Sequence, residues 1–397
     1  MSTSRFVLLV ACGSTIAAVA CSDTDGASEA SSGSAGMAAT SGPATGSGGS
    51  AGTGTSGTAG NVSSTGGSAS GGDAIGGNTA GGGSVDGGAG ADSAKPSDGA
   101  AGDGSVAGPD LVPSSLELIF SGVQNTRSAA QTLTLRNPSA TAVQIASVTL
   151  DPAAQGTPAF ELSGPQAGSS VAPGMSASAP IIFRPTAVGV FSTRVLIKTA
   201  APAGEKSVAL FGLGAKGLEG ENEPLLKPVI DTLGFAINVG GNGTLSTTTP
   251  LVGDEVQAFR FKASGTQPVE LVPVARYSPA EPIPYGYYSG ANEVPVGVIA
   301  SDQFQTLYPA TEAGAKLTFE APASEFGLFT TSKTHKTYTD DTKNAGNPTK
   351  HAVRTYPLKN RQGILVPNAY LVCMEEAANG DYQDYVFKIA NVVPVAR

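Results

Sequence analysis

The sequence has no tryptophan, two histidines and three cysteines in 397 residues, and these shortages disfavour several kinds of site. His335 and His351 do not form an H-x-x-x-H or H-E-x-x-H pattern, so a zinc centre built on histidines is not expected. Cys373 lies in the strand-like run AYLVCMEE without an adjacent base. It is expected to be a small buried apolar residue and not a catalytic thiol.

Charged side chains are also scarce, at 14% of the chain, and the net charge is −9. Between Ser22 and Pro109 the chain has eight acids and one base, Lys95, so this segment carries −8 + 1 = −7 of that total. The rest of the chain is close to neutral and has no basic face of the kind that phosphate binding requires. Nucleic acid is therefore not an expected partner.

About half of the 53 glycines lie between Ser22 and Gly108. That segment has no aromatic residue and few large aliphatic ones, so it cannot bury enough apolar surface to offset its backbone entropy. We expect residues 21–109 to form a disordered Gly/Ser/Ala-rich tether whose acids keep it solvated.

The N-terminal run MSTSRFVLLVACGSTIAAVAC has a basic residue, an apolar stretch and the small residues Ala18-Val19-Ala20 before Cys21. This is the layout of a secretory signal, and it is too short for a spanning helix. It resembles a bacterial lipoprotein signal, which implies a signal peptide at 1–20, a lipidated Cys21 and, with Ser22 next, the outer membrane. Cys12 follows better lipobox letters, but only about five apolar residues precede it, fewer than the about 7 to 15 of a signal.

From Leu116 onward, short runs of period-two alternation are separated by clusters of Pro, Gly, Asn and Asp. This pattern is typical of a β-sandwich. Seven such runs within residues 110–216 predict an immunoglobulin-like domain. The predicted strands are Leu116–Phe120, Ala130–Arg136, Val143–Leu150, Ala159–Leu162, Ser176–Phe183, Gly189–Thr199 and Lys206–Gly212.

Four segments of this domain carry a resemblance to a known family: LELIFSGVQNTRSAAQTLTLRNPS, AFELSG, VAPGMSASAPIIFRPTAVGVFSTRVLIKT and VALFGLG. In this order they resemble the ASH or MSP-like immunoglobulin repeat of choice-of-anchor D proteins. The resemblance covers about residues 110–215. It implies a binding or spacer role without catalysis.

The last unit, residues 222–397, contains about ten strand-like runs with turn-rich connections and no helical pattern. Gly234–Val239 is the first of these predicted strands. About 175 residues can bury one continuous core, so we expect a jelly-roll-like β-sandwich of two sheets. The unit resembles uncharacterised C-terminal β modules of secreted bacterial surface proteins, which share an FGxF strand, a YTDD turn and a final GDYxDYVF hairpin.

The run EEAANGDYQDYVF, residues 375–387, places four carboxylates and a glycine before a final strand. Glu375, Glu376, Asp381 and Asp384 stand at the positions that match related calcium-associated modules, so the resemblance implies a calcium site. Hard cations take about 6 to 8 oxygen ligands, and two acids three residues apart across a turn can face one ion. The alternative is a solvated turn, for which Asp, Asn and Gly are the usual residues.

Two further groups are candidate binding residues. Asp340 and Asp341 in YTDDTKN form a second oxygen-rich loop that would add ligands to the ion. Tyr285, Tyr287 and Tyr288 in IPYGYYSG predict an exposed aromatic platform for sugar rings, with packing at the rim of the sandwich as the alternative.

Together these features predict an all-β protein, lipid-anchored in a bacterial cell envelope, with a binding or structural role toward an extracellular glycan or a surface protein. The alternative is a carbohydrate-active hydrolase that uses residues 222–397, because a pair of catalytic carboxylates can come from any strands. A cleft with two close carboxylates flanked by tyrosines would favour hydrolysis. A surface with only a hairpin ion site would favour binding.

Overall fold

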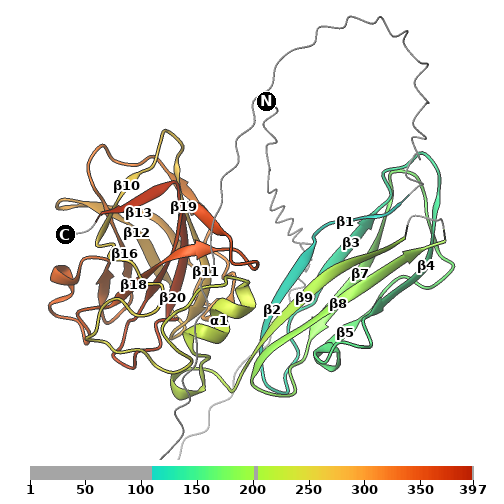
Figure 1. The fold of residues 1–397 in the computed structure, drawn as a ribbon, viewed down its shortest axis with the longest axis horizontal. Helices are drawn as coiled ribbons and strands as arrows, with labels where there is room; N and C mark the ends of the chain where they lie inside the picture. The colour runs from blue at the N-terminus through green and yellow to red at the C-terminus, as the bar shows by residue number, and fades with distance from the viewer. Residues whose placement is uncertain (1–109, 201–203, 396–397) are drawn as a thin grey trace, which may run out of the picture. The chain divides into compact units, whose positions relative to one another are not determined.

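The computed structural model describes residues 110–200 and 204–395 (Figure 1). The predicted signal peptide, Cys21 and the predicted tether lie outside these residues. Within the described ranges the regular secondary structure is nearly all β-strand, as the sequence predicts. No helix in these ranges is long and apolar enough to cross a membrane.

Residues 110–215 form an immunoglobulin-like sandwich of two sheets. One sheet has the order β1-β3-β7-β5 and the other the order β2-β9-β8-β4-β6. Strand β2 runs parallel to β9, and the other neighbours are antiparallel. The elements are β1 Val112–Pro113, β2 Glu117–Val123, β3 Gln131–Arg136, β4 Val143–Leu150, η1 Thr157–Ala159, β5 Phe160–Leu162, β6 Ser170–Val171, β7 Ser176–Phe183, β8 Gly189–Thr199 and β9 Glu205–Ala215.

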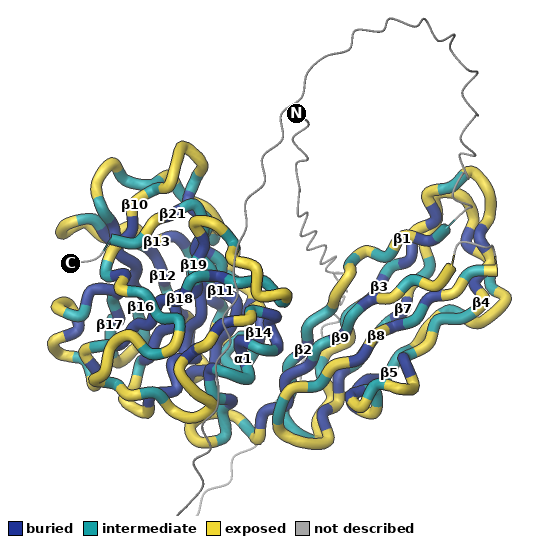
Figure 2. The backbone as a smooth tube through the Cα atoms, viewed as in Figure 1, coloured by how far each residue is buried: buried dark blue, intermediate teal, exposed yellow. Residues whose placement is uncertain are grey.

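Alternate residues of these strands fill the space between the two sheets, because successive side chains of a strand point to opposite faces. In β3, Leu133 and Leu135 are fully buried while the residues beside them are not. Phe120, Phe160 and Phe183 pack at the centre, with ring centroids 5.0 to 6.2 Å apart. Figure 2 shows this alternation as buried and exposed segments along each strand.

Residues 226–395 form a second, larger sandwich. One sheet has the order β14-β11-β20-β19-β18 with β15 also on β11, a second has the order β13-β12-β16-β17, and β10 pairs with β21. The elements are α1 Leu226–Leu233, β10 Arg260–Ala263, β11 Val269–Tyr277, β12 Ile283–Ser289, β13 Asn292–Ile299, β14 Gln305–Leu307, β15 Thr318–Phe319, β16 Gly327–Thr331, β17 Lys336–Tyr338, η3 Asp341–Asn344, β18 Val353–Lys359, β19 Leu365–Met374, β20 Tyr385–Ala390 and β21 Val392–Val395, with η2 Gly220–Asn222 before them.

The six-stranded sheet of this unit is covered on both faces, as strand β19 illustrates. Leu371 and Cys373 pack in a core with helix α1, whereas Val372 and Met374 pack in the core shared with the four-stranded sheet. All four residues are at most 1% exposed, so this end of the strand, LVCM, is a continuous apolar run. Cys373 is therefore buried, as the sequence predicts, and burial raises the pKa of its thiol.

Helix α1 corrects the sequence analysis, which found no helical pattern in this unit. Pro228 falls in the first turn, where proline is tolerated, and Gly234 ends the helix with φ +81°. The predicted strand Gly234–Val239 is wrong, because the residues after the helix form no strand. The buried apolar positions of the helix follow the i, i+3, i+4, i+7 spacing of an apolar stripe: Leu226, Val229, Ile230 and Leu233.

Candidate metal centre

The loop 375–384 joins β19 and β20, two neighbouring antiparallel strands inside the six-stranded sheet. Its ends are fixed by backbone hydrogen bonds to the strands beside them. The Glu375 N–H donates to the Ala352 carbonyl at 2.9 Å, and the Asp384 carbonyl accepts from the Tyr277 N–H at 3.2 Å. The loop therefore starts and ends in the interior of the sandwich and not at a free edge.

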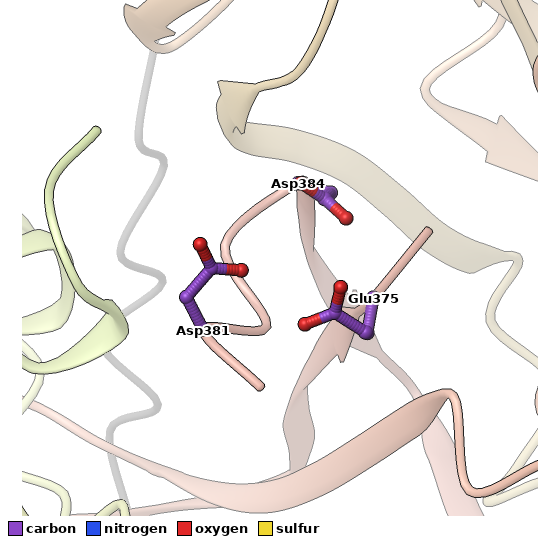
Figure 3. A group of neighbouring side chains, drawn as sticks. All are labelled: Glu375, Asp381 and Asp384. Carbon is purple, nitrogen blue, oxygen red and sulfur yellow. The ribbon is translucent and has the colours of Figure 1, made fainter. Parts of the chain in front are cut away.

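The carboxyl groups of Glu375, Asp381 and Asp384 face one another within this loop (Figure 3). One oxygen from each lies within 4.8 Å of the other two, and the residues are 1%, 7% and 6% exposed. Oxygens that bind calcium lie about 2.3 to 2.6 Å from the ion, so two of them are at most about 5 Å apart. The spacing of the three acids, the acid triad, therefore fits one such ion.

Backbone N–H groups orient Glu375. Its Oε1 accepts from Ala377 at 2.9 Å, and its Oε2 accepts from Gly380 at 3.1 Å and from Tyr382 at 3.2 Å. Three donors hold this carboxyl group in one position, because the loop folds back over it. Such preorganisation lowers the entropy lost when a ligand binds.

Asp381 and Asp384 are oriented in the same way but less completely. Asp384 accepts from the Glu376 N–H, and Asp381 Oδ2 accepts from the Asn379 amide at 2.8 Å. Asp381 Oδ1 is buried without a hydrogen-bond partner. A buried polar atom without a partner costs free energy, which a bound cation would recover.

The backbone of the loop is unusual at Tyr382, which has φ +53°, a conformation that bulky residues rarely adopt. Its surroundings hold it there: its hydroxyl donates to the His351 carbonyl at 2.7 Å, and the Arg354 guanidinium lies 4.6 Å from its ring centroid. Gly380 is also required, since a Cβ there would overlap the Leu245 carbonyl. Backbone outliers of this kind concentrate at functional sites.

Burial raises the pKa of all three acids of the triad. The pKa of Glu375 rises to about 7, through burial and then through the charge of Asp381. Burial and the charges of both neighbours raise the pKa of Asp384 well above its usual range, and burial raises that of Asp381. Three buried carboxylates repel one another when ionised, so a cation would stabilise their ionised forms.

Glu376, the fourth predicted ligand, has other partners. Its carboxylate accepts from the Thr334 hydroxyl at 2.8 Å and from the Tyr385 hydroxyl. The structure thus brings together three of the four acids predicted from this run. That calcium binds to them stays a prediction.

Asp340 and Asp341 are also occupied elsewhere. Asp340 accepts from the Thr342 N–H at 3.0 Å and lies 3.3 Å from Arg260. Asp341 lies 3.2 Å from Nδ1 of His351. Neither belongs to the group of clustered acids in the described part of the chain, and that this loop adds ligands stays a prediction.

His351 is held between two carboxylates. Its Nδ1 faces Asp341 at 3.2 Å and its Nε2 faces Glu255 at 3.0 Å. Burial lowers the pKa of this imidazole, but the two carboxylates outweigh burial and raise the pKa to about 9. Both nitrogens are engaged, which leaves neither free to bind a metal or to act as a base.

The three predicted platform tyrosines do not share a surface. Tyr285 and Tyr288 are 1% exposed and lie in the core, so the interpretation of these two rings as an exposed platform is wrong. Tyr287 is half-buried, stacks on Phe319 with ring centroids 4.4 Å apart and lines a surface groove of about 870 Å³. Ligand binding by Tyr287 stays a prediction.

One acid near the triad was missed by the sequence analysis. Glu223 precedes helix α1, and burial raises its pKa to about 7, with the charge of Asp381 among the further causes. No local pattern connects residue 223 with the loop 375–384. Only the fold brings them together.

Comparison with known proteins gives weak likenesses. No protein-family model and no curated protein matches the chain. An ASH/PapD-like domain of human CEP192 is 12% identical over 28% of this chain and 87% of that chain, with a TM-score of 0.22. A Porphyromonas gingivalis protein of unknown function is 17% identical, with a TM-score of 0.22. The match covers 27% of this chain and 48%, about half, of the length of that protein. The CupB2 chaperone of Pseudomonas aeruginosa is 12% identical over 57% of this chain and 97% of the chaperone chain, with a TM-score of 0.22. Likenesses this weak carry no argument about function.

Proposed function

We propose that this protein is a lipid-anchored surface protein of a bacterial cell envelope, with a binding or structural role, whose C-terminal β-sandwich is stabilised by calcium. The observation that carries the calcium part of the proposal is the buried acid triad with the unpartnered Asp381 Oδ1. The clustered groups are all carboxylates, without histidine or cysteine, which favours calcium over zinc. Extracellular calcium modules bind with dissociation constants of about 10⁻⁴ to 10⁻³ M.

Calorimetric titration of the full-length chain with calcium tests this proposal. We expect one ion per chain, and we expect binding to be lost when Asp381→Asn and Asp384→Asn are combined, because two of the three charged ligands become neutral. Asp302→Asn, a change to an exposed acid, is the control and should bind as the natural chain does. Absence of binding by the natural chain at several millimolar calcium would contradict the proposal.

Anchoring rests on the N-terminal sequence. We expect Cys21 to carry the lipid and the immunoglobulin-like domain to act as a spacer, as its resemblance to ASH/MSP-like repeats implies. Cys21→Ser should therefore move the protein from the membrane fraction to the soluble fraction, whereas Cys12→Ser should not. Membrane retention of a chain with both changes would rule out anchoring through either cysteine.

Two observations favour binding over hydrolysis as the role of the C-terminal sandwich. The acid triad is buried, and the groove beside Tyr287 has one carboxylate in its lining, Glu325, which pairs with Lys262 at 3.1 Å. Glycosidases flank the scissile bond with two carboxylates about 5 to 9.5 Å apart. The groove therefore supports a glycan or protein ligand that is held and not cleaved. Release of reducing sugar from glycans by the full-length chain would contradict this.

A further inference from the structure

We propose that Glu223 is a fourth carboxylate ligand of the cation and that the side-chain oxygens of Gln305 and Gln383 complete its coordination. This inference rests on the proposed calcium site and deepens it. It adds a ligand from the segment that precedes helix α1, outside the loop that holds the acid triad.

The position of Glu223 is set by two glutamine side chains. Gln305 donates its amide N–H to Glu223 Oε1, and Gln383 donates to Glu223 Oε2 at 3.4 Å. Gln383 lies in the loop 375–384, between two members of the triad. Gln305 opens strand β14, where it pairs with Tyr277 of β11. The glutamines thus tie Glu223 to the loop and to the sheet beside it.

The oxygens of these two amides also indicate a bound ligand. Gln305 Oε1 and Gln383 Oε1 are both buried without a partner, and Gln383 is 0% exposed. Rotating either amide by 180° would not help, because it would place the amide oxygen against the Glu223 carboxylate. With Asp381 Oδ1, three buried oxygens close to the acids therefore have no donor. A cation would satisfy oxygens of both kinds.

The ligand count agrees with calcium. Three acids of the triad, Glu223 and two amide oxygens supply six oxygen donors, and calcium takes about 6 to 8. Magnesium keeps several of its waters and is bound through one or two carboxylates, so three clustered carboxylates with Glu223 beside them suit it poorly. Amide oxygens are ordinary calcium ligands and poor zinc ligands.

Glu223 belongs to residues 216–225, the connector between β9 and helix α1. A cation bound to Glu223 and to the triad would hold this connector against the loop 375–384. Calcium would then order the connector as well as the loop.

Terbium, a luminescent stand-in for calcium, gives a direct test on the full-length chain. The chain has no tryptophan, and its ten tyrosines all lie between residues 277 and 385, so emission sensitised by tyrosine reports on the C-terminal sandwich. Terbium is titrated first and then displaced with calcium. Glu223→Gln should weaken calcium binding by about tenfold or more, since even outer-shell groups commonly change metal affinity by that factor. Glu221→Gln, an exposed acid of the same connector, is the matched control.

The thermal midpoint with and without calcium distinguishes a ligand from a residue with only a structural role. Calcium should raise the midpoint of Glu223→Gln less than that of the natural chain, whereas loss of a purely structural contact would lower the midpoint equally in both buffers. Hydrogen exchange at residues 219–225 should slow with calcium in the natural chain and not in Glu223→Gln.

Equal calcium affinities of Glu223→Gln and the natural chain, with binding lost in Asp381→Asn, would overturn this inference alone. Failure of the natural chain to bind either ion would overturn the calcium site as well.

Discussion

Glu255→Gln is expected to lower the unfolding free energy of the C-terminal sandwich by about 3 to 5 kcal/mol, the cost of breaking a buried ion pair by removing one partner. Glu255 pairs with Arg354, and their side chains are 2% and 0% exposed. The change leaves the guanidinium charged and buried with neutral acceptors only, which are the carbonyls of Ser246 and Thr249 and the introduced amide oxygen. It also removes a carboxylate from His351.

Urea unfolding at pH 6, followed by tyrosine fluorescence, measures this loss in the full-length chain. All ten tyrosines lie in the C-terminal sandwich, so the first sandwich does not contribute to the signal. Glu325→Gln is the matched control, because it breaks a surface pair with Lys262 whose side chains are 33% and 55% exposed. Such a pair is worth less than about 1 kcal/mol. A similarly small loss for Glu255→Gln would show that the buried pair is not the stabilising contact inferred here.

The strands could be predicted from the sequence wherever the pattern was local and long. Strands β7 and β8 have the predicted bounds Ser176–Phe183 and Gly189–Thr199. The short strands β14, β17 and β21 were not predicted as separate elements. Strands of two to four residues depend on the neighbours that they pair with more than on their own composition.

Helix α1 was missed for a related reason. It has eight residues and contains Pro228, so its intrinsic helix propensity is low, and packing against the sheet supplies its stability. The four apolar positions at helical spacing and Gly234 after them were the local indications of the helix.

The candidate site, too, could be predicted only in part from the sequence. Glu375, Asp381 and Asp384 could be predicted as a group because one hairpin carries all three. Their burial could not, since Asp, Asn and Gly in a hairpin also describe a solvated turn. The three acids are buried, although residues 377–379 at the tip are exposed, because β19 and β20 have a paired strand on each outer side, β18 and β11. Glu223 and Gln305 lie far away in the sequence, where only the tertiary structure relates them to the loop.

In calcium-free buffer the C-terminal sandwich should lose stability as the pH rises from about 4.5 to 7. The pKa of Glu375 rises from 4.5 to about 7 on folding, chiefly through burial, and those of Asp381 and Asp384 are raised as well. In this window the folded chain binds more protons than the unfolded chain, so stability falls with increasing pH. One pKa unit is about 1.4 kcal/mol, so Glu375 alone corresponds to about 3 kcal/mol.

Calcium should reverse this pH dependence, because the ion binds the ionised carboxylates and displaces their protons. At ten times its dissociation constant, about 1 to 10 mM for an extracellular module, it adds about 1.4 kcal/mol. The measurement is the thermal midpoint of the full-length chain by tyrosine fluorescence, with and without millimolar calcium, at pH 5 and pH 7. In the natural chain the increase in midpoint from calcium should be larger at pH 7 than at pH 5. It should be absent at both pH values when Asp381→Asn and Asp384→Asn are combined.

His351, with its pKa raised to about 9, loses its contribution to folding stability mainly between pH 6.5 and 9. This loss is the same with and without calcium. An increment that is equal at the two pH values would mean that the ion does not compete with protons for the acid triad.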